Sequence, residues 1–431
     1  NANPSTLKPG SAVAVQLVRG DVSIASLGTL TYLQDNKLLA FGHPFTNKGE
    51  VNYLLSKAYI NTIIPSRNQP FKLGSPFEKL LGTINSDRGA GVAGNINKFP
   101  SIIPLRVKVV DEARELEKNV NVQMINDYSF LTTLGNSVAL QAIDGTIDRI
   151  GKGTAEVEVK LLARGIPELE LSRENMFYSQ NDIAVRALSD FNHLLNIISN
   201  NPFKEIDILD LQLKININKE DNTALLQEAK VLNETVNPGD TLKVEVIFHP
   251  YRKETFSKIV KVKLPEDINE GMANISITGG YFNNYGQNGE SNNHGSQELE
   301  VKQTQITGYK SFKAIIEEYK EAPHNNDLIL QVFPSYAGAP SQVSDLPATG
   351  TNSENMNEKE EGESNIQEKP PYPPALNPED PEKSLEEIKE TITTDYVLEG
   401  ELNLQVNIEK ENKGQKEEPK DDQNAANEKD Q

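Results

Sequence analysis

Cysteine is absent from the 431 residues of this chain, and histidine is rare. Without cysteine the chain has no disulfide bond, no thiol nucleophile and no thiolate ligand for a metal. The five histidines, at positions 43, 193, 249, 294 and 324, are dispersed and form no pair at helical spacing. We therefore expect no metal site and no cofactor.

Long apolar runs and phosphate-binding loops are also missing. No stretch approaches the roughly 18 to 20 apolar residues of a membrane-spanning helix, so no membrane span is expected. No glycine-rich loop follows a strand and opens a helix, which argues against nucleotide binding. The opening NANPSTLKPG lacks the basic and then apolar pattern of a signal peptide. We expect a processed chain or a piece of a longer one.

Charge is distributed unevenly along the sequence. Residues 341–431 hold 24 acidic and 9 basic side chains, which supply −15 of the net charge of −20. Low apolar content with high net charge predicts a disordered acidic tail over 341–431, in which only the amphipathic stretch YVLEGELNLQVNIEK, residues 396–410, could become ordered when bound. The first 110 residues hold 12 basic and 5 acidic side chains without clusters. That excess is too diffuse for a nucleic-acid surface, so no nucleic-acid partner is expected.

One pentapeptide of the predicted tail, LPATG at 346–350, matches the cell-wall sorting motif of Gram-positive surface proteins. Sorting also requires a hydrophobic stretch and a basic tail directly after the motif. The polar sequence TNSENMNEKEEGESN follows instead, so we reject the motif as an anchor.

Hydrophobic patterning divides the rest of the chain. The opening has apolar runs separated by the turn formers Gly20-Asp21 and Asp35-Asn36, and further apolar runs broken by glycines follow. This pattern predicts one all-β unit over 1–111. Residues 112–218 read as a mixed strand and helix region. The segment SRENMFYSQNDIAVRALSDFNHLLNIISNNPF, from Ser172, looks helical, with Ser179 or Asn181 as cap. His193 lies on it, and we interpret it as a helix-surface histidine.

The following region alternates in the manner of a sandwich. The runs LKVEVIF and SKIVKVKL place apolar residues on one face, so 219–280 is predicted to be a small β-sandwich. Residues 281–340 should complete the fold with a polar loop, a helix and a strand. The loop could hold a cation by its carbonyls, but it lacks the spaced carboxylates that calcium prefers. His249 ends a strand and should face solvent.

The stretch LAFGHPF, residues 39–45, holds the most interesting candidate residue. His43 follows an apolar strand, Gly42 lets the backbone turn closely, and Pro44 fixes the next φ angle. This setting suits a general base at the rim of a β core. It equally suits a histidine bonded to a neighbouring carbonyl for structural reasons. The acids that could orient the imidazole are Asp21, Asp35 and Asp87, each more readily interpreted as a solvated turn carboxylate.

A family resemblance adds to this interpretation. DVSIASLGTLTYLQDNKLLAFGHPF resembles the catalytic-histidine segment of SpoIVB-type serine peptidases, in which a Gly-Thr-apolar-Thr-aromatic strand runs through a turn into apolar-Gly-His. The matching residues here are Gly28, Thr29, Leu30, Thr31, Tyr32, Phe41, Gly42 and His43. The likeness extends from Leu7 to about Phe333, although only the first hundred residues resemble the peptidase itself.

The resemblance implies a mainly β protein with some α structure. It implies an incomplete chymotrypsin-like β-barrel, then an α+β region, a small sandwich and the acidic tail, in a protein of the bacterial cell envelope or exterior. His43 would be the general base, with Gly42, Pro44, Gly28 and Thr29 as its structural surroundings. A protein or peptide would be the substrate, and the sandwich or tail could contact partners.

The chain departs from the family at the nucleophile. The family serine lies in a Gly-Met-Ser-Gly-Ser-Pro motif that this chain lacks, and Gly74-Ser75-Pro76 corresponds to a different loop. In the long proteins of this kind the serine motif precedes the PGSAVAVQLVRGD segment. We therefore expect a peptidase part that is inactive alone because its serine lies outside the chain. The alternative is a non-catalytic envelope protein that binds a partner or acts as a scaffold. A serine motif encoded upstream of Asn1 would favour the peptidase hypothesis.

Overall fold

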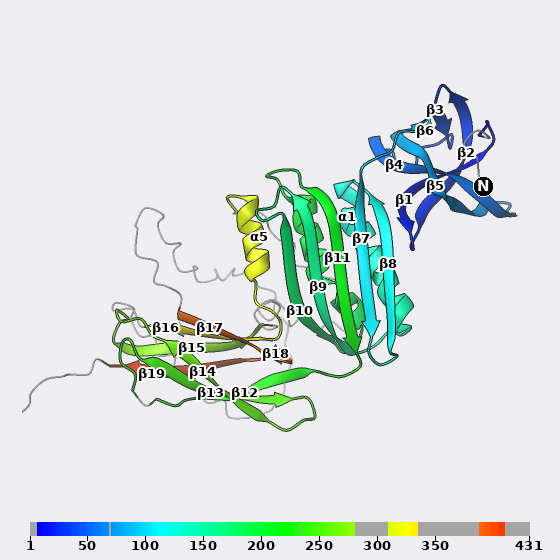
Figure 1. Ribbon diagram of the computed structural model, residues 1–431. Coiled ribbons are helices and arrows are strands. Elements are labelled where there is room, and N and C mark those ends of the chain that lie inside the picture. Colours follow the sequence, from blue (N-terminus) through cyan, green and yellow to red (C-terminus); the bar gives the residue numbers. More distant parts are fainter. Residues whose placement is uncertain (1–6, 69, 234, 281–308, 335–387, 410–431) are drawn as a thin grey trace, which may run out of the picture.

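The computed structural model describes residues 7–68, 70–233, 235–280, 309–334 and 388–409. Within these ranges the protein is mainly β, and three units follow one another: a barrel, a mixed sheet with helices, and a two-sheet sandwich (Figure 1). One hydrophobic core runs through the barrel and the mixed sheet, and the sandwich has its own. No helix in the described ranges is long and apolar enough to span a membrane.

The N-terminal unit is a closed barrel of six strands. They are β1 (Ala12–Gly20), β2 (Ile24–Gln34), β3 (Lys37–Ala40), β4 (Gly49–Ile64), β5 (Phe71–Arg88) and β6 (Gly91–Ile96). Their order is β1-β2-β3-β6-β5-β4, and β4 pairs again with β1, which closes the ring. Leu30, Leu38 and Ile84 fill its interior and are fully or almost fully buried. The turn predicted at Asp35-Asn36 is present, with positive φ at both residues, as a tight hairpin requires.

The central unit is a mixed five-stranded sheet in the order β10-β9-β11-β7-β8. Its strands are β7 (Ile102–Asp111), β8 (Leu116–Ile125), β9 (Gly153–Arg164), β10 (Glu170–Ser179) and β11 (Asp207–Asn218). Only β7 and β11 run parallel to each other; the other described neighbours in this sheet are antiparallel. Helix α1 (Tyr128–Ile147) packs against β7, β8 and α3 (Ser189–Asn200), and α2 (Ile183–Arg186) lies beside β10.

Three expectations for this region are corrected by the structure. Strand β7 pairs with β8 and β11, so the first unit ends before residue 102 and not at 111. Residues 172–179, expected to be helical, belong to strand β10 (Glu170–Ser179). The helix after it is split into α2 and α3, and its cap is Asp182, whose side chain accepts the backbone N–H groups of Ala184 and Val185.

The C-terminal unit consists of two four-stranded sheets, in the orders β14-β13-β12-β18 and β17-β16-β15-β19. The strands are β12 (Thr223–Val231), β13 (Thr241–Pro250), β14 (Phe256–Lys263), β15 (Gly271–Gly279), β16 (Asp327–Phe333), β17 (Ile388–Thr393), β18 (Val397–Glu399) and β19 (Glu401–Ile408). Buried side chains from both sheets form the second core, as a sandwich requires. Helix α5 (Phe312–Glu321) lies at the β10 edge of the central unit (Figure 1).

The predicted tail is corrected in one part. Residues 388–409 were expected to belong to a disordered tail, but they supply β17, β18 and β19 to the sandwich. Val397, Leu398, Val406 and Ile408 of these strands are buried in its core. The high net charge led to the prediction of disorder, although residues 396–410, which hold β18 and β19, were expected to order on binding. The rest of the predicted tail, 341–387 and 410–431, lies outside the described residues and includes LPATG. The polar loop expected after residue 280 also lies outside them.

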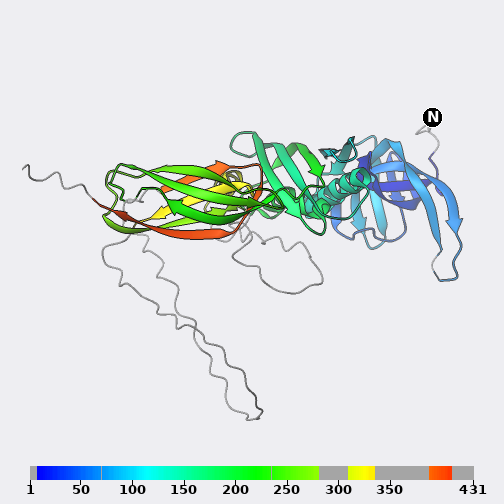
Figure 2. The same ribbon diagram turned by 90° about the horizontal axis from the view of Figure 1, so that it is seen from below.

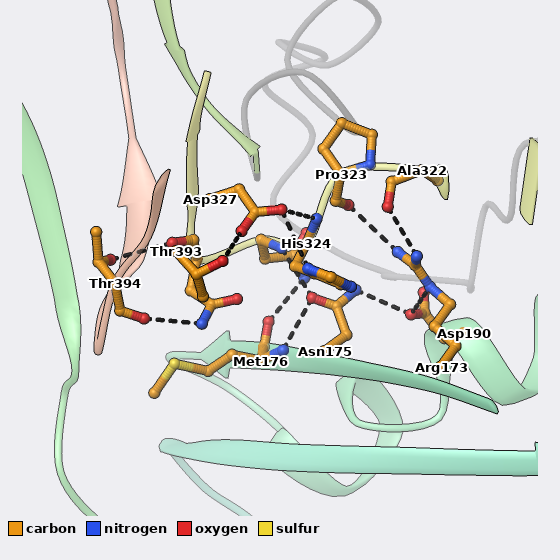
Figure 3. Close-up of polar contacts among 12 residues, drawn as sticks. Arg173, Asn175, Met176, Asp190, Ala322, Pro323, His324, Asp327, Thr393 and Thr394 are labelled. Carbon is orange, nitrogen blue, oxygen red and sulfur yellow. Dashed lines mark hydrogen bonds and ion pairs between the residues drawn. The ribbon is translucent and has the colours of Figure 1, made fainter. Parts of the chain in front are cut away.

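A buried polar network joins the central unit to the sandwich (Figure 3). Arg173 of β10 donates from Nε to the Asp190 carboxylate at 2.7 Å, and its other nitrogens donate to the carbonyls of Ala322 and Pro323. The side chain of Asn325 donates to the carbonyl of Met176. These bonds hold the loop between α5 and β16 against β10.

The barrel and the mixed sheet share a strand. The first half of β1 pairs with β2 and β4 inside the barrel, whereas Val18–Gly20 pair with Met124–Val122 of β8. At Gly20 the backbone of Asn121 lies so close that no Cβ could be accommodated. The two units are therefore one continuous sheet, consistent with their common core.

Candidate functional site

His43 lies on the loop that connects β3 to β4, at one end of the barrel, and its side chain is exposed. The loop leaves β3 through two consecutive residues with positive φ, Phe41 at 75° and Gly42 at 76°. For a bulky residue such as Phe41 this conformation is unfavourable unless its surroundings hold it.

Packing against β2 holds Phe41 in that conformation. Its backbone N–H donates to the carbonyl of Thr29 at 3.0 Å, and its ring covers Gly28 so closely that a Cβ there would overlap it. The Thr29 hydroxyl accepts a hydrogen bond from Nζ of Lys72 at 2.8 Å. Gly28 and Thr29, named as structural surroundings of His43, therefore act through Phe41 and through the neighbouring strand β5.

The His43 ring has a defined orientation. Its Nδ1 lies 2.8 Å from the carbonyl oxygen of Pro44. A carbonyl oxygen only accepts, so Nδ1 carries the proton and Nε2 of the neutral ring keeps its lone pair. Within the described ranges Nε2 has no hydrogen-bond partner. The ring of Phe41 lies 5.6 Å away between centroids and limits one side of the imidazole.

A buried carboxylate anchors the loop immediately after His43. Asp87, at the end of β5, accepts the backbone N–H groups of Phe45 (2.8 Å), Thr46 (2.5 Å) and Asn47 (3.0 Å). It also accepts the Thr46 hydroxyl at 2.7 Å. Burial opposes ionisation, but these donors outweigh it and hold the pKa of Asp87 below its ordinary value. Asp87 is fully buried, so its interpretation as a solvated turn carboxylate was wrong.

The Thr46 hydroxyl connects Asp87 to the barrel core. Since Thr46 donates its only hydroxyl proton to Asp87, it accepts from the hydroxyl of Tyr53, 2.8 Å away. Burial, with the nearby carboxylates, raises the pKa of Tyr53, although the bond to Thr46 acts in the opposite direction. Tyr53 therefore remains a neutral donor in this chain of bonds.

Aromatic rings and one ion pair extend the support to the central unit. The rings of Phe41, Phe45, Tyr53 and Phe130 follow one another edge to face, with centroids 5.9 to 6.4 Å apart. Nζ of Lys48 lies 2.6 Å from the Asp127 carboxylate, which caps α1. The segment from residue 41 to residue 48 is thus fixed from the barrel and from the helix layer.

The other acids proposed to orient His43 lie elsewhere. Asp21 accepts the backbone N–H of Asn121 at the β1–β8 junction, and Asp35 occupies the hairpin turn. In the described part of the chain no carboxylate is bonded to the His43 ring; the Pro44 carbonyl takes that place. Gly74-Ser75-Pro76 forms part of strand β5.

The remaining histidines have structural surroundings. His193 on α3 is half-buried with its ring edge-to-face against Tyr319, so the expected helix-surface position is only partly correct. His249 is exposed on β13, as expected. His324 has Nδ1 3.1 Å from the Asp327 carboxylate, which also accepts the Thr393 hydroxyl (Figure 3). His294 lies outside the described residues.

The pair His324 and Asp327 was missed by sequence analysis because four-residue loops carry no periodicity that would predict it. Asp327 also accepts the backbone N–H of His324, so its bonds close the loop that begins β16. Burial opposes ionisation of Asp327, but the bonds to His324 and Thr393 lower its pKa overall. No serine hydroxyl is bonded to this imidazole in the ranges described.

Metal ligation finds no support in the described ranges, where no group of three or more histidine, aspartate or glutamate side chains is placed to hold an ion. No family model matches this chain, and no significantly similar protein was found among curated proteins or among solved structures.

Proposed function

We propose that this chain is part of an exported SpoIVB-like serine peptidase and supplies its general base, His43. The nucleophilic serine would belong to a polypeptide segment outside the chain, since no Gly-Met-Ser-Gly-Ser-Pro motif occurs here. In this proposal the barrel is one half of a chymotrypsin-like arrangement, and the serine-bearing half docks against the end of the barrel where the residue 41–48 loop lies.

The observation that carries the proposal is the orientation of the imidazole. With Nδ1 bonded to the Pro44 carbonyl, the lone pair of Nε2 is exposed on a loop that Asp87 holds in place. An incoming serine hydroxyl could donate its proton to Nε2 while its oxygen attacks a peptide carbonyl, and the imidazolium could then protonate the leaving amine. A base alone hydrolyses little, so the isolated chain should be inactive.

The orienting group distinguishes this arrangement from a Ser-His-Asp triad. A peptide carbonyl fixes the tautomer as a carboxylate does, but it carries no full charge to stabilise the imidazolium. Asp87 would contribute indirectly, by binding the backbone of residues 45–47. It is therefore a positioning residue in this proposal.

The test is fluorophosphonate labelling of the mature protein from its natural source, which includes any serine-bearing segment. We expect His43→Ala to lower the labelling rate at least about a thousandfold. His249→Ala, which removes an exposed imidazole from β13, is the matched control and should label normally. Equal labelling of the wild type and His43→Ala would remove His43 from the mechanism.

A non-catalytic role is the second candidate, and one observation favours it. The buried bonds of Arg173 and Asn325 fasten the sandwich to the central unit, as expected of a scaffold that holds binding surfaces at fixed separation. In that case no serine in the mature protein would react with the fluorophosphonate at all, and His43→Ala would leave partner binding unchanged.

A further inference from the structure

Strands β4 and β5 are longer than the barrel that they help to close. β1 pairs with β4 only as far as Lys57, and β6 pairs with β5 only from Gly82 onward. Between these points the two strands pair only with each other, from Ala58↔Pro76 to Ile64↔Phe71. This hairpin, residues 58–79 and here called the arm, extends away from the barrel (Figure 2).

Large apolar side chains of the arm are exposed. They are Tyr59 (62%), Ile63 (61%), Phe71 (55%), Leu73 (51%), Ile64 (37%) and Phe77 (37%). In a strand, alternate residues share a face, so Phe71, Leu73 and Phe77 lie on one side of β5. The register adds Ile64 and Tyr59 to that side, opposite Phe71 and Ser75. Isolated exposed apolar residues are ordinary, but a cluster of this kind marks an interaction surface.

Each face at the end of the arm carries an exposed apolar side chain. Ile64 shares one face with Phe71, whereas Ile63 lies opposite Lys72 on the other. The Lys72 face approaches the barrel, because Lys72 binds Thr29 of β2 and a Cβ at Gly74 would contact Leu27. A protein partner would cover one face of such a ribbon. A lipid interface can cover the exposed apolar side chain at the end of each face, Ile64 on one and Ile63 on the other.

The charge of the arm favours a negatively charged surface. The arm holds three basic residues, Arg67, Lys72 and Lys79, and one acidic residue, Glu78 at its base next to Lys79. The whole chain carries −20, so this is an exception to its overall charge. Each basic residue near an anionic membrane contributes about 1 kcal/mol, or roughly a fivefold increase in affinity.

We propose that the arm binds the surface of an anionic lipid bilayer obliquely, with Ile63, Ile64 and Phe71 in contact with the interface and Arg67, in the connection between Ile64 and Phe71, at the level of the headgroups. Insertion is shallow, because along the described part of the arm no third strand pairs with β4 or β5, and backbone groups at such edges must stay hydrated. Aromatic and aliphatic side chains flanked by basic residues suit this interfacial depth. The inference is independent of the role of His43.

The absence of tryptophan from the chain permits a direct test. Phe71→Trp places a single tryptophan at the start of β5, beside the tip, and Phe99→Trp places one at a similarly exposed phenylalanine between β6 and β7. With vesicles of phosphatidylcholine and phosphatidylglycerol (about 7:3), we expect a blue shift of the Phe71→Trp emission and none for Phe99→Trp. Equal behaviour of the two variants would overturn the proposal.

Sedimentation with the same vesicles separates the contributions of charge and apolar contact. Arg67→Gln should bind about fivefold more weakly, and raising the salt concentration should weaken the wild type. Ile63→Ser with Phe71→Ser should lower binding at least tenfold, whereas Leu225→Ser and Ile259→Ser on the sandwich should not. Unchanged unfolding midpoints would show that these exposed substitutions leave the fold intact.

An acidic protein is the competing kind of partner, and the same variants distinguish it. If the wild type binds poly-glutamate but does not sediment with the anionic vesicles, the arm is a protein-binding surface and the membrane proposal is wrong. Binding to vesicles of pure phosphatidylcholine with the same affinity would also contradict it, since the basic residues would then have no role.

Discussion

Asp87 accepts hydrogen bonds from both the backbone N–H and the hydroxyl of Thr46, at 2.5 and 2.7 Å. These two residues lie on different elements, the end of β5 and the loop that carries His43. The position of the imidazole therefore depends on a carboxylate that does not touch it.

The substitution Asp87→Asn tests this dependence. An amide presents one accepting oxygen and two hydrogens to a cluster of four donors, so we expect a loss of about 3 kcal/mol in the free energy of unfolding. Urea denaturation at pH 7 measures it. Asp35→Asn, in an exposed turn, is the control and should change stability by less than about 0.5 kcal/mol.

The stability difference between the wild type and Asp87→Asn should depend on pH. Because the folded-state pKa of Asp87 is lowered, its contribution is present above the ordinary aspartate pKa of about 3.9 and is lost as pH falls through the folded-state value. The difference between the wild type and Asp87→Asn should therefore shrink below about pH 4. A difference that stays constant into this range would show that the Asp87 charge contributes nothing.

Gly28→Ala should displace the Phe41 ring, since the added Cβ would overlap it. We expect destabilisation of about 2 kcal/mol, within the range for overpacked sites, and a change in the nuclear magnetic resonance signals of His43. Gly89→Ala is the control, because its Cβ would meet no atom within 4 Å. Unperturbed His43 signals in Gly28→Ala would show that Phe41 does not hold the loop.

Arg173→Met should cost about 3 to 5 kcal/mol, because it leaves the Asp190 carboxylate buried without its partner. It also removes the donors that bind the carbonyls of Ala322 and Pro323. Scanning calorimetry should show the sandwich melting earlier and separately. Arg164→Met, which breaks an exposed ion pair to Asp207, should cost at most about 1 kcal/mol. Equal effects of the two substitutions would contradict a structural role for the Arg173 network.

His193 gives the chain a sensitivity to mild acid. Burial is the main cause that lowers the pKa of His193, and the charge of Arg173 lowers it further. The carboxylates of Asp190 and Glu318 act in the opposite direction. The unfolded chain therefore binds more protons than the folded chain below the ordinary histidine pKa of about 6.5, so this contribution to stability falls as pH drops. Urea denaturation between pH 5 and 8 should show a shallower dependence for His193→Gln than for the wild type. His249→Gln should follow the wild type.

The sequence predicted the strand-rich architecture where period-2 patterning was unbroken. Strand β9 (Gly153–Arg164), in the region expected to mix strands and helices, shows such alternation of valines and charged residues. Helix α1 was not predicted, because threonine, serine, asparagine and glycine interrupt its apolar positions. Its burial between the sheet and α3 stabilises it despite this composition, which no local pattern reveals.

The candidate site was predictable in part. Gly42 and Pro44 beside His43 indicated an exposed loop at a strand end, and the ring is indeed exposed. The position of Asp87 was not predictable, because it depends on β5 returning beside the loop over a separation of about forty residues. The six-stranded ring brings these segments together, and its closure by β1 and β4 is a long-range pairing.

The shared strand β1 has a consequence for dissection of the molecule. In an excised barrel, residues 18–20 of β1 would lose their pairing with β8. In an excised mixed sheet, β8 would lose its pairing with β1. Neither piece can be expected to behave as an autonomous folding module. A protease cut in the connection near Phe99 should leave both products associated, and heat should melt them in a single cooperative event.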